Sequence, residues 1–226
     1  LDLAWRDPVT ESNRLPYPPA ALQDRVGRLD FLASGWRIYS DLKSAVAPYI
    51  RLSSCGSVLD WGCGSGRTLR YLLEDVSPDR IHGCDIDADA ISWLRRSIQG
   101  PSFTRINAFP PTPYADGSFE FVYGISVFTH LDEATQRRWL KELQRITAPD
   151  GIVAVSVLGA SFPPADLQRE AQDKGFADVI SGQSGTFQAY STPDYYRITY
   201  HSGQYLVSEW SKYFTILEII ERGINS

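Results

Sequence analysis

The sequence has few of the residues that build metal centres and disulfide frameworks. Its 226 residues include three histidines and three cysteines, Cys55, Cys63 and Cys84. An odd number of cysteines without ligand spacing predicts neither a disulfide framework nor a zinc site. The acidic residues and histidines also lack ligand spacing, so we expect no bound metal. Methionine is absent even at position 1, which indicates that the sequence does not begin at the natural start.

Long apolar runs and an excess of positive charge are missing as well. No segment approaches the roughly 18 apolar residues of a membrane-spanning helix, and the N-terminus lacks the basic and apolar regions of a secretory signal. We therefore expect a cytoplasmic protein without a membrane span. The net charge of −5 is atypical of a protein dedicated to nucleic acids, so none is expected as a partner. The sequence does not predict an oligomeric state.

The first fifty residues contain a proline-rich arm followed by a helical pattern. Four prolines within the first 20 residues predict an extended arm, because proline fixes φ and removes a backbone donor. A stripe of apolar residues then predicts a helix up to about residue 50, and this stripe consists of Ile38, Tyr39, Leu42, Val46 and Tyr49. We expect residues 1–50 to form an arm and a lid helix.

Strand and helix patterns alternate from residue 56 onward. Short apolar segments predict strands at residues 57–60, 80–85, 103–107 and 119–124, and the apolar run 152–158 predicts a strand buried on both faces. Asp87 and Asp132 are placed to cap the helices that follow them. The alternation predicts an α/β fold over residues 51–226, with a doubly wound, mainly parallel sheet and helices on both faces.

A glycine-rich loop follows the first predicted strand. In a parallel sheet, ligands bind beyond the carboxyl ends of the strands, and the loop here reads DWGCGSG over residues 60–66. A dinucleotide fingerprint that starts at Gly62 needs glycine at its sixth position, which is Arg67. A nicotinamide-dependent dehydrogenase is therefore disfavoured. At the end of the second strand, the Asp85 carboxylate is placed to accept hydrogen bonds from ribose hydroxyls.

Three segments, in this order, resemble the motifs of class I S-adenosylmethionine-dependent methyltransferases. They are VLDWGCGSGR (58–67), HGCDID (82–87) and SFEFVYGISVFTHL (118–131), and the resemblance covers about residues 35–160. It implies a Rossmann-like methyltransferase fold, S-adenosylmethionine as the cofactor, and an enzyme that transfers a methyl group to an acceptor.

The resemblance also implies a set of cofactor-binding residues. Asp60 would support the ammonium group, Asp85 would bind the ribose, and Ile86 would lie beside the adenine. Asn107 and Ala108 stand at the adenine edge, although many relatives carry Asp in place of Asn107. The full set is Asp60, Gly62, Cys63, Gly64, Gly66, Asp85, Ile86, Asn107, Ala108, Gly124 and Ile125.

The acceptor is expected to be a small-molecule or glycan hydroxyl. Residues 126–131 and 200–214 resemble methyltransferases of surface-polysaccharide or glycolipid pathways. A hydroxyl acceptor benefits from a general base, and the candidates are His130, after the fourth strand, and His201, in an acceptor-side insertion expected around residues 160–212. The alternatives are an amine or carboxylate acceptor, or a cofactor-binding scaffold without activity.

The C-terminus departs from the family pattern. The family sheet normally ends in an antiparallel hairpin, and residues 214–220 supply only its first strand. We therefore expect an incomplete hairpin, either because the chain is truncated or because another segment takes the place of the second strand. Helices are expected to start at Pro163-Pro164 and near residue 204, on either side of a Gly- and Ser-rich stretch at 181–192.

Overall fold

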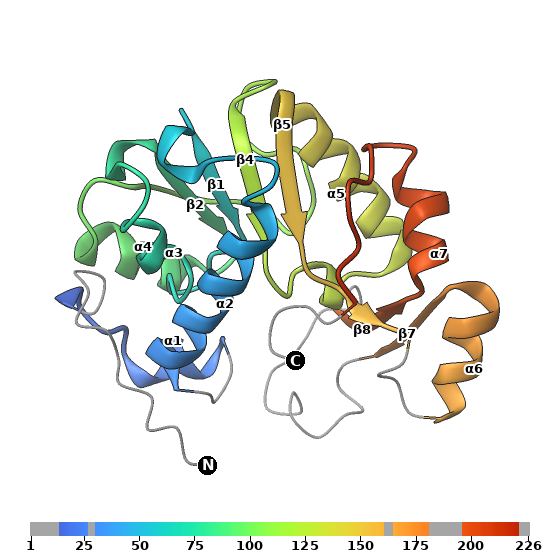
Figure 1. The fold of residues 1–226 in the computed structure, drawn as a ribbon. Helices are drawn as coiled ribbons and strands as arrows, with labels where there is room; N and C mark the ends of the chain where they lie inside the picture. Colours follow the sequence, from blue (N-terminus) through green and yellow to red (C-terminus); the bar gives the residue numbers. More distant parts are fainter. Residues whose placement is uncertain (1–13, 27–29, 161–164, 181–195, 222–226) are drawn as a thin grey trace, which may run out of the picture. The chain divides into compact units, whose positions relative to one another are not determined.

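The computed structural model describes residues 14–26, 30–160, 165–180 and 196–221. Its main sheet has five strands in the order β3-β2-β1-β4-β5 (Figure 1). This arrangement confirms the predicted α/β fold with a parallel sheet. The chain divides into two compact units, Leu1–Ile106 and Asn107–Ile224, which are described in turn.

The first unit contains three parallel strands and the helices that follow them. The strands are β1 (Val58–Trp61), β2 (Ile81–Asp85) and β3 (Ser102–Arg105), with Val58 paired with Ile81 and His82 with Ser102. The helices are α1 (Ala20–Asp24), α2 (Phe31–Val46), α3 (Leu69–Leu72) and α4 (Ala88–Ser97), with 3₁₀ turns at Leu52–Ser54 and Pro78–Arg80. These strands lie within one residue of their predicted starts.

The N-terminal helix pattern is confirmed in its main part. Helix α2 begins after Asp30, whose Oδ1 accepts from the backbone N–H groups of Leu32 and Ala33 at 3.0 and 2.9 Å. The predicted stripe is buried through Val46, where the helix ends, whereas Tyr49 lies beyond it and is 40% exposed. The Asp87 cap of α4 is confirmed too, since its Oδ1 accepts from the N–H groups of Asp89 and Ala90.

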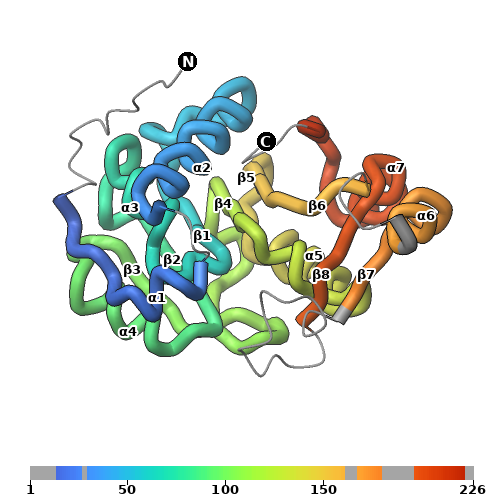
Figure 2. Tube along the Cα trace, turned by 90° about the horizontal axis from the view of Figure 1, so that it is seen from below, coloured from blue at the N-terminus to red at the C-terminus, as the bar shows by residue number. Residues whose placement is uncertain are grey.

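The second unit combines two strands of the main sheet with a small sheet of its own. Strands β4 (Phe119–Gly124) and β5 (Thr147–Val155) run parallel, and β6 (Leu158–Gly159), β8 (Arg197–His201) and β7 (Phe176–Ile180) form the small sheet in that order. The helices are α5 (Glu133–Ile146), α6 (Ala165–Lys174) and α7 (Gly203–Tyr205), with a 3₁₀ turn at Phe128–His130 and a π-helical turn at Leu206–Trp210. Figure 2 shows α6 and α7 beside the small sheet.

Helix α5 was well marked in the sequence. The side chain of Asp132 caps it by accepting from the Thr135 N–H at 2.7 Å, as predicted. The expected helix near residues 204–212 is confirmed as α7 and the π-helical turn. The Pro163-Pro164 pair and residues 181–192 lie outside the described residues.

Two predictions for the C-terminal half are wrong. The run 152–158 is not one strand buried on both faces: residues 152–155 are half-buried, β5 ends at Val155, and Leu158 belongs to the small sheet. Residues 214–220 form no strand, and Leu217 and Ile220 are about half exposed. The antiparallel pair that the structure does describe is β7 with β8, upstream of that segment.

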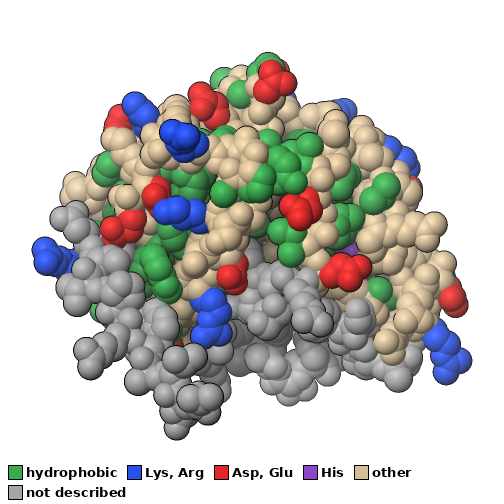
Figure 3. Space-filling view, viewed as in Figure 1, with side chains coloured by type: hydrophobic (Ala, Val, Ile, Leu, Met, Phe, Trp, Pro, Cys, Tyr) green, Lys and Arg blue, Asp and Glu red, His purple; other side chains and the backbone are tan. Residues whose placement is uncertain are grey.

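The described surface carries mixed charge. On the face shown in Figure 3, acidic and basic side chains are interspersed among apolar and uncharged groups. Within the described ranges, no helix has both the length and the apolar character needed to cross a membrane. The same ranges contain no group of three or more His, Cys, Asp or Glu side chains arranged to hold a metal ion.

Candidate functional site

The glycine loop after β1 lies directly against the end of β2. Because β1 and β2 are parallel, their carboxyl ends meet at one edge of the sheet. The Cys84 carbonyl there accepts from the N–H groups of Gly62 at 2.8 Å and Cys63 at 3.1 Å. Two predicted parts of the site, the loop and Asp85, are thereby brought together within the first unit.

Two loop glycines are required by their backbone conformation and surroundings. Gly64 has φ +51° and Gly66 has φ +80°, in the left-handed region that side chains disfavour. A Cβ on Gly64 would lie 2.7 Å from Val26 Cγ1, and one on Gly66 would lie 2.8 Å from Leu94 Cδ2. The loop therefore packs backbone against neighbouring side chains at distances that only glycine allows.

The Asp85 carboxylate is fixed by backbone donors on both of its oxygens. Oδ2 accepts from the Gly64 N–H at 2.7 Å, and Oδ1 accepts from the Asp87 N–H at 2.8 Å. Burial raises the pKa of Asp85, and these backbone hydrogen bonds oppose that rise. The next residue, Ile86, is 46% exposed, so a polar acceptor and an apolar surface stand side by side at the end of β2.

Asp60 and Cys63 of the loop are both buried. Asp60 is buried at the end of β1. Burial raises the pKa of the Cys63 thiol well above its usual value, and the charges of Asp60 and Asp85 raise it further. The thiol is therefore neutral near pH 7, so Cys63 contributes packing and backbone to the loop and no thiolate.

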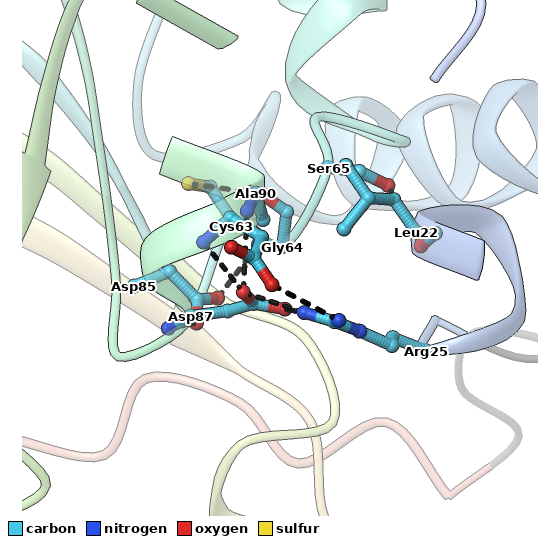
Figure 4. Close-up of polar contacts among 9 residues, drawn as sticks. Leu22, Arg25, Cys63, Gly64, Ser65, Asp85, Asp87 and Ala90 are labelled. Atoms are coloured by element: carbon cyan, nitrogen blue, oxygen red, sulfur yellow. Dashed lines mark hydrogen bonds and ion pairs between the residues drawn. The ribbon is translucent and has the colours of Figure 1, made fainter. Parts of the chain in front are cut away.

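An N-terminal segment contacts the loop and was not identified from the sequence. Nη1 of Arg25, which follows α1, donates to both carboxylate oxygens of Asp87 at 2.8 and 2.6 Å (Figure 4). Its Nη2 donates to Asp89 at 3.1 Å. The Ser65 hydroxyl donates to the Leu22 carbonyl at 3.3 Å. Asp87 carried a cap signal, but nothing in the local sequence of Arg25 points to a partner 62 residues away.

The second unit holds the remaining predicted residues. Asn107 is exposed and Ala108 half-buried, and the Ala108 carbonyl accepts from Trp139 Nε1 at 3.1 Å. At the end of β4, Gly124 is buried and Ile125 half-buried. The following residue, Ser126, has φ +58° and its N–H donates to Ser156 Oγ at 2.7 Å. Such strain in a non-glycine residue is typical of functional sites.

His130 follows β4 in an arrangement that defines its tautomer. Its Nδ1 lies 3.2 Å from the Arg197 carbonyl oxygen, which can only accept, so Nδ1 carries the proton and Nε2 the lone pair. The ring stacks on Tyr196 at 4.6 Å between centroids. Burial lowers the pKa of His130, against the opposing effect of the carbonyl. The imidazole is therefore neutral near pH 7.

His201 is placed differently from the other candidate base. It is 1% exposed, and its Nε2 lies 2.9 Å from Gln136 Oε1. The Gln136 amide in turn donates to the carbonyls of Phe128 at 3.0 Å and Leu131 at 2.9 Å. Burial lowers the pKa of His201 to about 4. This position, inside a buried network between β8 and α5, favours a structural role over proton transfer.

Comparison with known proteins points to one enzyme class. Residues 58–151 match a family described as a methyltransferase domain. A malonyl-[acyl-carrier protein] O-methyltransferase of Halorhodospira halophila is 32% identical over 114 residues, which are 49% of this chain and 36% of that protein. A trans-aconitate 2-methyltransferase of Sinorhizobium fredii is 26% identical over 133 residues, or 57% of this chain and 49% of that protein.

A solved structure shares the fold. A methyltransferase structure from Methanosarcina mazei has a TM-score of 0.54 at 21% identity, covering 75% of this chain and 84% of that one. Residues 58–151 therefore match a methyltransferase domain, and the fold is that of the class I methyltransferases that use S-adenosylmethionine. The chain spans less than half the length of the two curated relatives.

The first unit fits this cofactor in its own geometry. A carboxylate has about four acceptor positions, and the backbone donors to Asp85 leave room for ribose hydroxyls. The exposed Ile86 offers an apolar contact to a purine. Tight loop glycines allow close approach to the polar end of a nucleoside.

Proposed function

We propose that the protein transfers a methyl group from S-adenosylmethionine to an oxygen of a small molecule, with a hydroxyl as the acceptor. The methyltransferase match supports the reaction class. The name of the Halorhodospira relative, an O-methyltransferase, supports oxygen as the acceptor atom. The observation that carries the hydroxyl is the neutral His130, with its proton held on Nδ1.

The proposed cofactor roles follow the predicted residues. Asp85 accepts from the ribose hydroxyls, Ile86 and Asn107 with Ala108 contact the adenine, and Asp60 supports the ammonium group. The backbone around Gly62, Cys63, Gly64 and Gly66 receives the amino-acid end, and Gly124 and Ile125 line the reacting end. When bound, the cofactor supplies a methyl group activated by a sulfonium.

His130 is proposed as the general base. A neutral imidazole whose Nδ1 donates to a carbonyl is oriented to accept a proton at Nε2. The acceptor hydroxyl would give its proton to Nε2 as its oxygen bonds to the methyl carbon and becomes an ether. The bond from that carbon to the cofactor's sulfur would break, with the electron pair left on a neutral thioether. A positioned base of this kind contributes about 10²- to 10⁴-fold in rate. For His201 we propose a structural role.

The test is methylation with labelled cofactor of separate panels of sugars and other alcohols, carboxylic acids and amines. We expect label in a hydroxyl, and we expect His130→Gln to lose about 10²-fold or more in rate while binding S-adenosylhomocysteine as the wild type does. His82→Gln, a half-buried histidine of β2, is the matched control and should retain the rate. Label found only in amines, or a fully active His130→Gln with hydroxyl acceptors, would reject the proposal.

Within hydroxyl acceptors, we propose sugars of glycans or glycolipids. The ring of Tyr196, which lies against His130, supports this, because rings with polar tips suit stacking on sugars. Tyr196 already stacks on the imidazole.

A carboxylate acceptor is the second candidate, favoured by the names of the malonyl and trans-aconitate relatives. A carboxylate has already lost its proton at pH 7. It would therefore be methylated equally well by His130→Gln.

A further inference from the structure

Helix α5 holds the loop that follows β3 through a buried indole. Trp139 is 2% exposed, and its Nε1–H donates to the Ala108 carbonyl at 3.1 Å. A carbonyl fixed in this way also fixes the plane of its own peptide, which links Ala108 to Phe109. The backbone of Ala108 and the start of Phe109 are therefore oriented by α5.

A buried carboxylate three residues further along α5 fixes the same loop again. Glu142 is 6% exposed, and its Oε1 accepts from the Thr112 N–H at 2.6 Å and the Thr112 hydroxyl at 2.7 Å. Arg145 donates to both of its oxygens, at 2.7 and 3.0 Å. Burial would raise the pKa of Glu142, but these hydrogen bonds outweigh it and lower the pKa to about 2. The anchor is therefore ionised throughout the neutral range.

A third contact lies between these two on the outer side of the loop. The Arg138 guanidinium stands over the Phe109 ring, 5.8 Å from its centroid. Positions 138, 139 and 142 thus hold residues 108–112 by a cation–π contact, a neutral hydrogen bond and a charged one. One helix therefore fixes this loop, which contains the proline pair Pro110-Pro111.

We propose that Trp139 and Glu142 are positioning residues that set the recognition of the adenine base. The inference rests on the proposed placement of Asn107 and Ala108 at the adenine edge. Hydrogen bonds depend steeply on distance and angle, so a small shift of this loop should weaken base recognition more than ribose binding. Neither side chain needs to touch the cofactor.

The test compares two nucleosides by calorimetry. S-adenosylhomocysteine and S-inosylhomocysteine differ only at the base edge, where an amino donor is replaced by a carbonyl acceptor and N1 gains a hydrogen. Trp139→Phe keeps an aromatic side chain, although a smaller one, and removes the Nε1 donor. We expect it to weaken S-adenosylhomocysteine about three- to tenfold, the value of one hydrogen bond, and to reduce the preference for it over the inosine analogue.

Two further variants keep the test decisive. Trp93→Phe makes the same change on α4, outside this loop, and should retain both affinities. Thr112→Val removes one hydrogen bond to Glu142 and should reduce the preference about two- to threefold. It serves in place of Trp139→Phe should that variant lose its native circular dichroism.

The outcomes distinguish the positioning role from the proposed placement of Asn107 and Ala108 at the adenine edge, on which that role rests. If Trp139→Phe weakens both nucleosides equally, or neither, the positioning role is overturned. If Asn107→Ala loses the preference while Trp139→Phe and Thr112→Val keep it, the adenine placement stands and only the positioning role fails. A wild-type protein without any preference between the two nucleosides overturns the placement, and the positioning role with it.

Discussion

Each oxygen of the Asp85 carboxylate accepts a backbone N–H, from Gly64 and from Asp87. These donors come from the two loops that meet at the end of β2, so one side chain links both. The same carboxylate is the proposed partner of the ribose hydroxyls. Its orientation is thus set by the fold before a ligand contributes.

Replacing this carboxylate by an amide should weaken nucleoside binding strongly. Asp85→Asn replaces one of the two acceptor oxygens by an NH₂ donor and removes the charge. Hydrogen bonds to charged groups contribute about 1.5–3 kcal/mol each. We expect the Kd of S-adenosylhomocysteine to rise about tenfold or more by calorimetry. Asp79→Asn, at the opposite end of β2, is the control. Equal affinity of Asp85→Asn and wild type would contradict the ribose role.

The protonation state of His130 should govern the pH dependence of hydroxyl methylation. The base must be neutral, and burial lowers its pKa below the usual 6.5. We therefore expect the rate at saturating substrate to be flat around pH 7–8 and to fall only on acidification, with a midpoint below 6.5. A midpoint above 7, or a profile unchanged in His130→Gln, would contradict this assignment.

Some of these residues could be predicted from the sequence and others could not. Asp85 and the glycines sit at fixed positions in a strand–loop–helix pattern, so local spacing reveals them. Trp139 and Glu142 lie on α5, whose buried apolar face is enough to account for a tryptophan at position 139. The sequence therefore gives no reason to expect a hydrogen bond from its indole. Their partners are 31 and 30 residues away, and no local pattern encodes a contact at that range.

At the scale of elements, α1 and Arg25 form a segment that we call the strap. Leu22 contacts Ser65 of the glycine loop, and Arg25 pairs with Asp87 beside it. One nitrogen of Arg25 donates to both oxygens of Asp87, and the Arg25 side chain is 38% exposed. Exposed pairs contribute only about 0.2–1 kcal/mol. We expect Arg25→Gln to speed the dissociation of S-adenosylhomocysteine by up to about fivefold in stopped-flow measurements.

The control for the strap is Lys43→Gln. It removes a comparable surface ion pair, with Asp75, away from the glycine loop. It should leave the dissociation rate unchanged. Equal rates for all three proteins would show that the strap does not retain the ligand.

The C-terminal elements show where local propensity misleads. Residues 214–220 are rich in β-branched and aromatic side chains, and such residues favour strands only where a neighbouring strand pairs with them. The described chain gives them no such partner. The five strands of the main sheet, by contrast, are each marked by apolar residues between turn signals, and their alternation with helices predicts a doubly wound sheet.

At the scale of the whole molecule, His201 should make stability depend on pH. Its pKa is about 4 in the folded protein and about 6.5 unfolded. Between these values the unfolded chain binds a proton that the folded protein does not, so stability falls as pH drops. We expect a loss of roughly 1–2 kcal/mol between pH 7 and pH 5 from this group.

Urea unfolding at both pH values measures this effect. His201→Gln should lower stability at pH 7, because the buried network with Gln136 changes. The further loss between pH 7 and pH 5 should nevertheless be smaller than in the wild type. A variant as sensitive to acid as the wild type would show that His201 is protonated in the folded protein.

Helix α5 connects two parts of the proposed site. Gln136 donates hydrogen bonds to the turn that carries His130. Trp139 and Glu142 make hydrogen bonds to the loop that contains Ala108 and Thr112. The positions of both segments therefore depend on the single helix α5. A tilt of α5 would move both segments together. Substitutions along α5 should therefore change nucleoside selectivity and turnover together, and would rarely change one without the other.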